Sequence, residues 1–191
     1  MGERDWDVLL IGGASGTGKS SVSYRLAQHL GVGITEIDDL HASLLGMTTP
    51  AQLPMVHYWR THPEVEALEA GQIFALFLAV SRAMAPAIQA VVEQHLDSRV
   101  PIVLEGDYLL PETVVAHPRV RTVFLYEPDE AQLLANYAAR EPDGGVQAKR
   151  ARVSWLQGEW LREECGRLDI PALPARPWET VLGRILALVG P

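Results

Sequence analysis

Lysine is nearly missing from this chain of 191 residues, in which Lys19 and Lys149 are the only two. Cysteine is scarcer still. The single Cys165 excludes a disulfide within the chain and is typical of proteins in a reducing compartment. The net charge of −8 argues against a general nucleic-acid binder, because such proteins normally carry a basic surface. It does not exclude a small anionic substrate, since a few arginines can override the overall sign locally.

Long hydrophobic runs are missing as well. The longest run, residues 73–80, is far shorter than the roughly 20 residues that span a membrane as a helix. The N-terminal sequence MGERDWD is acidic and lacks the basic and apolar regions of a secretory signal. We therefore expect a cytoplasmic protein that binds neither a membrane nor nucleic acid. The oligomeric state stays open at this point, a homodimer included.

A glycine-rich stretch is present near the start, where residues 12–21 read GGASGTGKSS. It contains the full Walker A pattern. Glycines let the backbone curl so that successive N–H groups point at phosphate oxygens. In this pattern the lysine reaches the β- and γ-phosphates and the following serine binds Mg²⁺. The sequence therefore predicts a site for ATP and Mg²⁺ with Ser20 on the metal, formed by Gly13, Ala14, Ser15, Gly16, Thr17, Gly18, Lys19, Ser20 and Ser21.

Apolar runs that end in polar residues alternate with helical patterns along the chain. This order predicts a three-layer α/β/α fold of the P-loop NTPase type, with a parallel five-stranded sheet in one domain over residues 1–191. Such sheets bind ligands at the carboxyl ends of their strands. The predicted strands lie within residues 7–13, 33–40, 100–111, 120–130 and 168–177.

Two segments interrupt the alternation. Residues 41–98 form a mostly helical insertion that we expect to hold the phosphate acceptor, with a loop over residues 44–64 and a long helix that Pro86 kinks or divides. Residues 140–154 form a small basic lid, in which residues 141–153 are turn-prone and connect two helices.

Acidic pairs follow two of the predicted strands. Asp38 and Asp39 close the second strand, and Glu105 and Asp107 close the third. A carboxylate there can accept the proton of a substrate hydroxyl or help to hold Mg²⁺. We expect Asp38 to be this base, and strand alternation to turn only one of the first pair toward the site. The alternative is that these acids cap the helices that follow.

Basic and aromatic residues supply the remaining candidates. Arg140, Arg150 and Arg152 belong to the lid, where an arginine can neutralise charge on the transferred phosphoryl group; the alternative is a solvated basic helix start. Which of the three acts stays open, with Arg140 and Arg150 as the first candidates. The residues expected to contact the acceptor are Asp39, His41, Tyr58, Arg60, Glu105 and Asp107.

The chain lacks the sequence signatures of other classes of nucleotide-binding protein. A GTPase needs an Asn/Thr-Lys-x-Asp element to read guanine, and Lys149 in QAKRAR does not fit it. A large motor ATPase needs a longer chain. A small-molecule kinase fits the length, and its substrate-holding insertion and basic lid both have candidate segments.

Over residues 8–111 the chain resembles P-loop kinases of the nucleoside-monophosphate-kinase-like group, and within that group the 2-phosphoglycerate kinase-like proteins. The similar segments are IGGASGTGKSSVSYRLAQHLG, ITEIDDL and IVLEGDYLLP. IDDL is also similar to the VDSL of chloramphenicol phosphotransferase, in which the aspartate is taken as the base; the matching residue here is Asp38. Both resemblances imply ATP, Mg²⁺ and a small hydroxylated acceptor, and the fold implies that Arg176 lies near the adenine.

The two resemblances imply different phosphate acceptors. In residues 41–98 the only arginines are Arg60 and Arg82, and there is no lysine, so a neutral alcohol fits as well as the strongly anionic 2-phosphoglycerate. A kinase of a nucleotide sugar is a third acceptor class. A nucleotide-binding regulatory module that transfers no phosphate is the alternative function.

Overall fold

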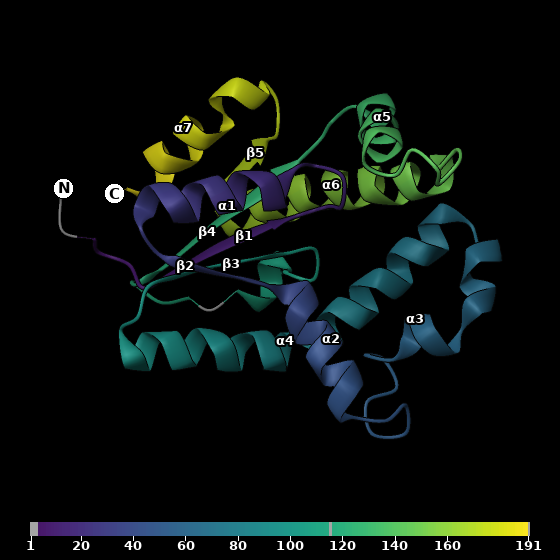
Figure 1. Cartoon of the computed structure of the whole chain (residues 1–191), viewed down its shortest axis with the longest axis horizontal. Helices are drawn as coiled ribbons and strands as arrows, with labels where there is room; N and C mark the ends of the chain where they lie inside the picture. The colour runs from purple at the N-terminus through teal and green to yellow at the C-terminus, as the bar shows by residue number, and fades with distance from the viewer. Residues whose placement is uncertain (1–3, 115, 191) are drawn as a thin grey trace.

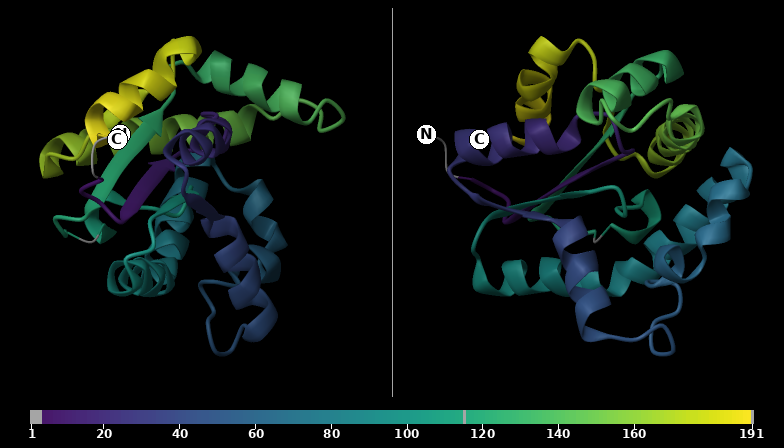
Figure 2. Two further views of the ribbon diagram at one scale, coloured as in Figure 1. Left: turned by 60° about the vertical axis from the view of Figure 1, so that its left-hand side comes forward. Right: turned by 45° about the vertical axis from the view of Figure 1, so that its right-hand side comes forward.

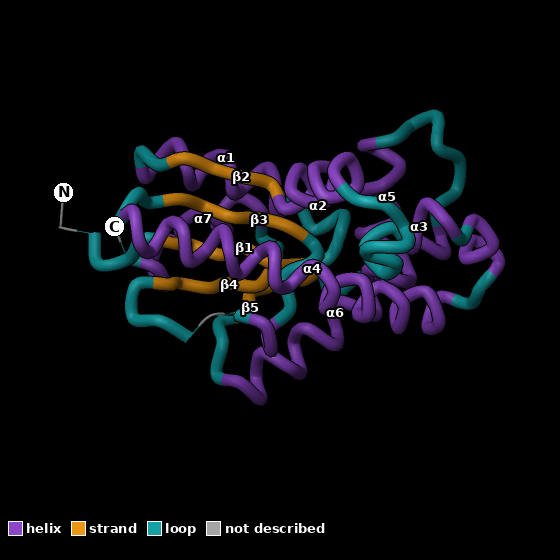
Figure 3. Tube along the Cα trace, turned by 90° about the horizontal axis from the view of Figure 1, so that it is seen from below, coloured by secondary structure: helices purple, strands orange, loops and turns teal. Residues whose placement is uncertain are grey.

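The computed structural model describes residues 4–114 and 116–190, and these form a five-stranded parallel sheet between two layers of helices (Figure 1). The strand order is β2-β3-β1-β4-β5, and the strands lie side by side in Figure 3. Their bounds are Val8–Gly13 for β1, Gly33–Glu36 for β2, Ile102–Gly106 for β3, Val120–Tyr126 for β4 and Ala172–Pro174 for β5. The predicted fold class is confirmed.

Seven α-helices and two 3₁₀ turns connect these strands in the part of the chain just named. The α-helices are α1 (Lys19–Leu30), α2 (Ile37–Met47), α3 (Tyr58–Thr61), α4 (Ala70–Ser98), α5 (Glu130–Arg140), α6 (Ala148–Leu168) and α7 (Trp178–Val189). The 3₁₀ turns are η1 (Pro63–Ala67) and η2 (Pro111–Thr113). Figure 2 shows α4 on the opposite side of the sheet from α1 and α7.

The central strand β1 is buried on both faces, as expected of a strand in a parallel sheet covered by helices. Its side chains alternate between two cores. Leu9 and Ile11 pack with residues of α1 and α7, whereas Val8 and Leu10 pack with residues of α4 and α6. The continuous apolar run in the sequence therefore reflects burial from both sides.

The expectation that the second strand carries Asp38 and Asp39 at its end is wrong. The strand β2 stops at Glu36, and both aspartates lie in the first turn of α2. Carboxylates are favoured there because the N-terminal end of a helix carries partial positive charge. Neither residue is the N-cap, which is Glu36. Because they lie on a helix, the two side chains point about 100° apart rather than to opposite faces.

The insertion is more helical than expected. The predicted loop over residues 44–64 instead contains the end of α2, the short helix α3 and part of η1. The following helix α4 is one continuous element that includes Pro86. Its axis changes direction partway along (Figure 1), which is the expected effect of a proline that lacks an N–H and crowds the preceding turn.

By length and composition alone, α4 is long and apolar enough to cross a membrane, with a mean hydropathy of 1.7 over 18 residues. This corrects the expectation that no apolar segment reaches such a length. The buried residues of α4, which include Met84, Ile88 and Val92, pack against the sheet. Core helices of globular domains meet the same length and composition test.

The lid is also more ordered than expected. The helix α6 begins at Ala148, so the connection between α5 and α6 covers only residues 141–147. Arg150 and Arg152 therefore lie on the first turns of a helix rather than in a loop. A helix fixes the directions of these two side chains more tightly than a loop would.

We predict that the buried carboxylate of Asp7, directly before the central strand β1, stabilises the fold through its ion pair with Arg119. Asp7 is 2% exposed and accepts a hydrogen bond from Arg119 Nη2 at 2.7 Å. The hydrogen bonds from Arg119 lower the pKa of Asp7 below its usual 3.8. Asp7→Asn should lower the free energy of unfolding at pH 7 by about 1–3 kcal/mol, measured by urea denaturation.

Because the folded-state pKa is lowered, the contribution of Asp7 is complete above about pH 4 and is lost as the pH falls through that lower value. The difference between wild type and Asp7→Asn should therefore shrink at pH 3. Asp5→Asn is the matched control, since Asp5 forms an exposed pair with Arg121. An equal effect of the two variants at pH 7 contradicts the prediction.

Candidate active site

The loop between β1 and α1 has the backbone of a phosphate-binding turn. Gly16 and Gly18 have φ values of 83° and 84°, which side chains with a Cβ rarely adopt. A Cβ on Gly18 would also lie 2.8 Å from Cη2 of Trp178. The Thr17 hydroxyl donates to the Ala14 carbonyl at 2.8 Å and closes the turn.

Lys19 lies at the start of α1 and forms an ion pair with Asp107. The lysine is 8% exposed. Burial by itself would lower the pKa of Lys19, but the negative charges of Asp107, Glu105 and Asp38 outweigh it and raise the pKa above its usual value. The ammonium group is therefore held charged among three carboxylates, which is the state that binds phosphate.

Glu105 occupies the end of β3 and is 2% exposed. Burial raises the pKa of Glu105, while the charge of Lys19 and the neighbouring Ser20 hydroxyl oppose this effect. One carboxylate oxygen, Oε2, has no hydrogen-bond partner among the described residues. A hydroxyl next to a carboxylate with an unused oxygen is the kind of donor set that Mg²⁺ prefers.

The described residues contain no cluster of three or more His, Cys, Asp and Glu side chains that could hold a metal by themselves. Mg²⁺ needs no such cluster, because it is usually bound by one or two protein oxygens together with nucleotide phosphates. Ser20 and Glu105 therefore fit a magnesium site that is complete only with a nucleotide.

Asp38 lies in the first turn of α2. The residue is exposed. Partial desolvation and the negative charge of Asp107 raise the pKa of Asp38, and the charge of Lys19 partly opposes them. Asp39 is exposed next to it, and its backbone carbonyl accepts from the Ser43 hydroxyl at 2.8 Å.

Tyr108 is a central residue that sequence reasoning missed. Its ring stacks on Phe77 at 5.5 Å and meets the edge of His41 at 5.1 Å. Burial, followed by the charges of Asp38 and Asp107, raises the pKa of Tyr108 to about 12. The available signal was its position directly after Asp107 in the sequence EGDYLL.

The other acceptor candidates lie on α2 and α3. His41 is engaged with the Val56 carbonyl at 2.9 Å, which ties α2 to the loop that follows it. The Tyr58 ring stacks on His62 at 4.1 Å, and Arg60 is exposed on α3. Within residues 4–114 and 116–190, no hydrogen bond or ion pair connects Tyr58 or Arg60 to the carboxylates around Lys19.

A cavity of about 500 Å³ lies against the phosphate-binding loop. It is lined by residues 16–21 of the loop and by Arg140, Arg176 and Trp178, among others. Arg176 Nε lies 3.4 Å from Glu127 Oε2 at the edge of this cavity. The cavity thus extends from the predicted phosphate site to the position at which Arg176 was expected to meet the adenine.

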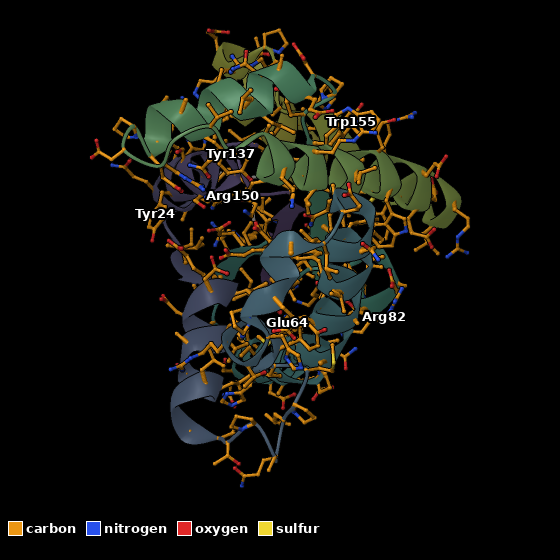
Figure 4. The ribbon with its side chains drawn as sticks, turned by 90° about the vertical axis from the view of Figure 1, so that its right-hand side faces the viewer. Tyr24, Glu64, Arg82, Tyr137, Arg150 and Trp155 are labelled. Carbon is orange, nitrogen blue, oxygen red and sulfur yellow. The ribbon has the colours of Figure 1, made fainter. Side chains whose placement is uncertain are left out.

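Two lid arginines share one carboxylate and one aromatic ring. Arg140 Nη2 and Arg150 Nη1 each lie 2.9 Å from an oxygen of Glu141, and both guanidinium groups lie over the ring of Tyr137. Hydrogen bonds from Gln147, Arg150 and Arg140 lower the pKa of Glu141. This carboxylate keeps both arginines together, and Figure 4 labels Arg150 and Tyr137 of this group.

Arg152 lies in a different environment from the other two. Its Nη1 is 2.8 Å from Glu130 Oε2, and its guanidinium group lies over the ring of Trp155. Arg140 lines the nucleotide cavity directly, and Arg150 is joined to it through Glu141. The geometry therefore favours Arg140 and Arg150 over Arg152 as lid arginines.

Comparison with known proteins agrees with this geometry. No family model matches the chain. It is 28% identical over 111 residues to a 2-phosphoglycerate kinase from Pyrococcus furiosus and 26% identical over 111 residues to another from Methanothermobacter thermautotrophicus. Each match covers 54% of this chain, and the chain covers 36% of each relative's length.

Solved structures resemble the whole chain. A gluconokinase from Sinorhizobium meliloti has a TM-score of 0.57 at 21% identity, with 98% of this chain and 93% of that chain covered. A shikimate kinase from Acinetobacter baumannii has a TM-score of 0.53 at 17% identity, with 96% and 93% covered. The fold is therefore that of the P-loop kinases.

We predict that Lys19→Met abolishes most nucleotide binding. The variant removes a charge-assisted hydrogen bond to phosphate, which contributes about 1.5–3 kcal/mol or about 10- to 150-fold in Kd. Calorimetric titration with ATP and Mg²⁺ measures the change, and circular dichroism checks that the variant is folded. Arg25→Met is the matched control, because Arg25 is exposed on the same helix. Unchanged affinity in Lys19→Met shows that the loop does not bind phosphate.

Proposed function

We propose that the protein is an ATP-dependent kinase that transfers the γ-phosphate of ATP to a hydroxyl group of a small molecule. The observation that carries the proposal is the placement of Asp38 and Asp107 next to Lys19, which itself lines the cavity at the phosphate-binding loop. A loop that only binds nucleotide needs no carboxylate poised on the acceptor side. The relative from Pyrococcus furiosus is a 2-phosphoglycerate kinase and the structural neighbours are a gluconokinase and a shikimate kinase, which supports a kinase.

Each residue of the site has a role in this reaction. The loop N–H groups and Lys19 hold the phosphates, and Asp107 keeps the Lys19 side chain in place. Arg140 and Arg150 neutralise charge that develops on the transferred phosphoryl group. Ser20 and Glu105 would hold Mg²⁺, which would supply positive charge to the phosphates. Arg176 would contact the adenine.

Asp38 serves as the base that accepts the proton of the acceptor hydroxyl. Its raised pKa makes it a better proton acceptor than a free carboxylate. His41 and Tyr108, which lie beside it, would orient the acceptor. In the proposal, the outer part of the acceptor side is formed by Asp39, Tyr58 and Arg60. Asp39 directly follows the base, Asp38, in the sequence.

Asp38→Asn should lower kcat by about 10²–10⁴-fold, the usual contribution of a general base. The Kd for ATP should stay within about threefold, which corresponds to a change in binding free energy below about 1 kcal/mol. Turnover is measured by coupled ADP release with a broad panel of alcohols, and binding by calorimetry. The wild-type rate should also fall as the pH drops through the raised pKa of Asp38, because the protonated carboxyl cannot accept a proton.

Asp97→Asn is the control for loss of a carboxylate, since Asp97 is exposed near the end of α4. Full transfer by Asp38→Asn shows that Asp38 is not the base. ATP binding without transfer to any acceptor contradicts the proposal and favours a nucleotide-binding regulatory module.

A further inference from the structure

A second cavity of about 650 Å³ lies between the insertion and the lid. Its walls come from α3, η1 and the start of α4 on one side, and from residues 141–153 on the other. Figure 4 looks onto this side of the molecule, with Arg150 of the lid above Glu64 of η1. The volume falls within the range of about 300–1,000 Å³ that is usual for small-molecule sites.

The walls of this cavity are largely apolar. Five of its lining residues have apolar side chains, namely Trp59, Val65, Ile73, Val146 and Val153. Val146 is 87% exposed at the rim, although removing its isopropyl group from water would be energetically favourable. An apolar ligand in the cavity would provide that contact.

The four charged lining residues sum to zero formal charge. Two are acidic, Glu66 and Glu141, and two are basic, Lys149 and Arg150. Lys149 Nζ donates to the Glu66 carbonyl at 2.8 Å, and Arg150 is paired with Glu141. A carboxylate or phosphate on the ligand would compete with Glu141 for Arg150, whereas an uncharged ligand would not.

The cavity adjoins the proposed chemistry at two points. Arg150 and Glu141 line it, and Glu141 also holds Arg140, which lines the nucleotide cavity. On the other wall, the side chain of Trp59 approaches the hydroxyl of Tyr108, near Asp38. A molecule of moderate size in the cavity can thus direct a hydroxyl toward the γ-phosphate.

We propose that the phosphate acceptor is an uncharged alcohol whose apolar body occupies this cavity. The inference rests on the proposed kinase function and names the substrate class for it. In the reaction the acceptor oxygen forms a bond to the γ-phosphorus, the bond from that phosphorus to the bridging oxygen of ADP breaks, and Asp38 receives the hydroxyl proton. The apolar walls and the zero formal charge of the lining favour such an alcohol over an anionic one such as 2-phosphoglycerate.

A matched pair of probes tests the charge requirement. 1-Phenyl-1,2-ethanediol and mandelate share a phenyl ring and a benzylic hydroxyl, and differ in a hydroxymethyl group against a carboxylate. Each is titrated by calorimetry into the full chain with Mg²⁺ and a non-hydrolysable ATP analogue. The diol should bind at least about tenfold more tightly than mandelate, and 2-phosphoglycerate should not bind.

A pair of variants tests the location. Ile73→Asp places a charge in the apolar wall and should weaken diol binding at least about tenfold, with the affinity for the ATP analogue unchanged. Val100→Asp is the matched control, because Val100 is 54% exposed and is not among the residues that line the cavity. It should leave diol binding unchanged.

Three outcomes overturn the inference: mandelate or 2-phosphoglycerate binds as tightly as the diol, the diol fails to bind at millimolar concentration, or Ile73→Asp binds it normally. Transfer of phosphate to an anionic alcohol refutes the inference and leaves the kinase function intact. Diol binding that depends on Ile73, without transfer to any acceptor, refutes the kinase function and leaves the binding class intact.

Discussion

The parallel pairing of β1 with β3 is the constraint on which the site depends. Ile11 pairs with Glu105 and Gly12 with Gly106, so the phosphate-binding loop and the acidic segment leave the sheet side by side. A Cβ on Gly106 would lie 2.6 Å from Cβ of Ile37. Because Gly106 has none, the first turn of α2 packs closely and brings Asp38 to the same edge.

This arrangement concentrates charge of one sign around a single lysine. Lys19 is surrounded by Asp107, Glu105 and Asp38, whose negative charges outnumber its own. The lid carries positive charge at the same cavity as Lys19. There Glu141 holds Arg140 and Arg150 over Tyr137. In the proposed function, phosphate oxygens would replace Glu141 as partners of these arginines, and nucleotide binding would then rearrange the lid.

The local patterns in the sequence predicted the sheet, the helices that flank it and the phosphate-binding loop. They succeeded because burial on both faces gives β1 a continuous apolar run, and because positive φ values at Gly16 and Gly18 require glycine. They failed where a polar residue is compatible with more than one type of secondary structure. The carboxylates of Asp38 and Asp39 stabilise a helix start as readily as they follow a strand, and the location of Tyr108 depends on packing between Phe77 and His41, which are distant in sequence.

The central claim is that the carboxylates beside Lys19 serve transfer of phosphate to an alcohol. Phosphorus-31 NMR of the protein with ATP, Mg²⁺ and a panel of uncharged alcohols follows every phosphorus atom at once. The account predicts that ADP and a new phosphomonoester appear together in equal amounts. Formation of ADP with inorganic phosphate alone, or bound ATP that stays intact with every acceptor, would contradict it.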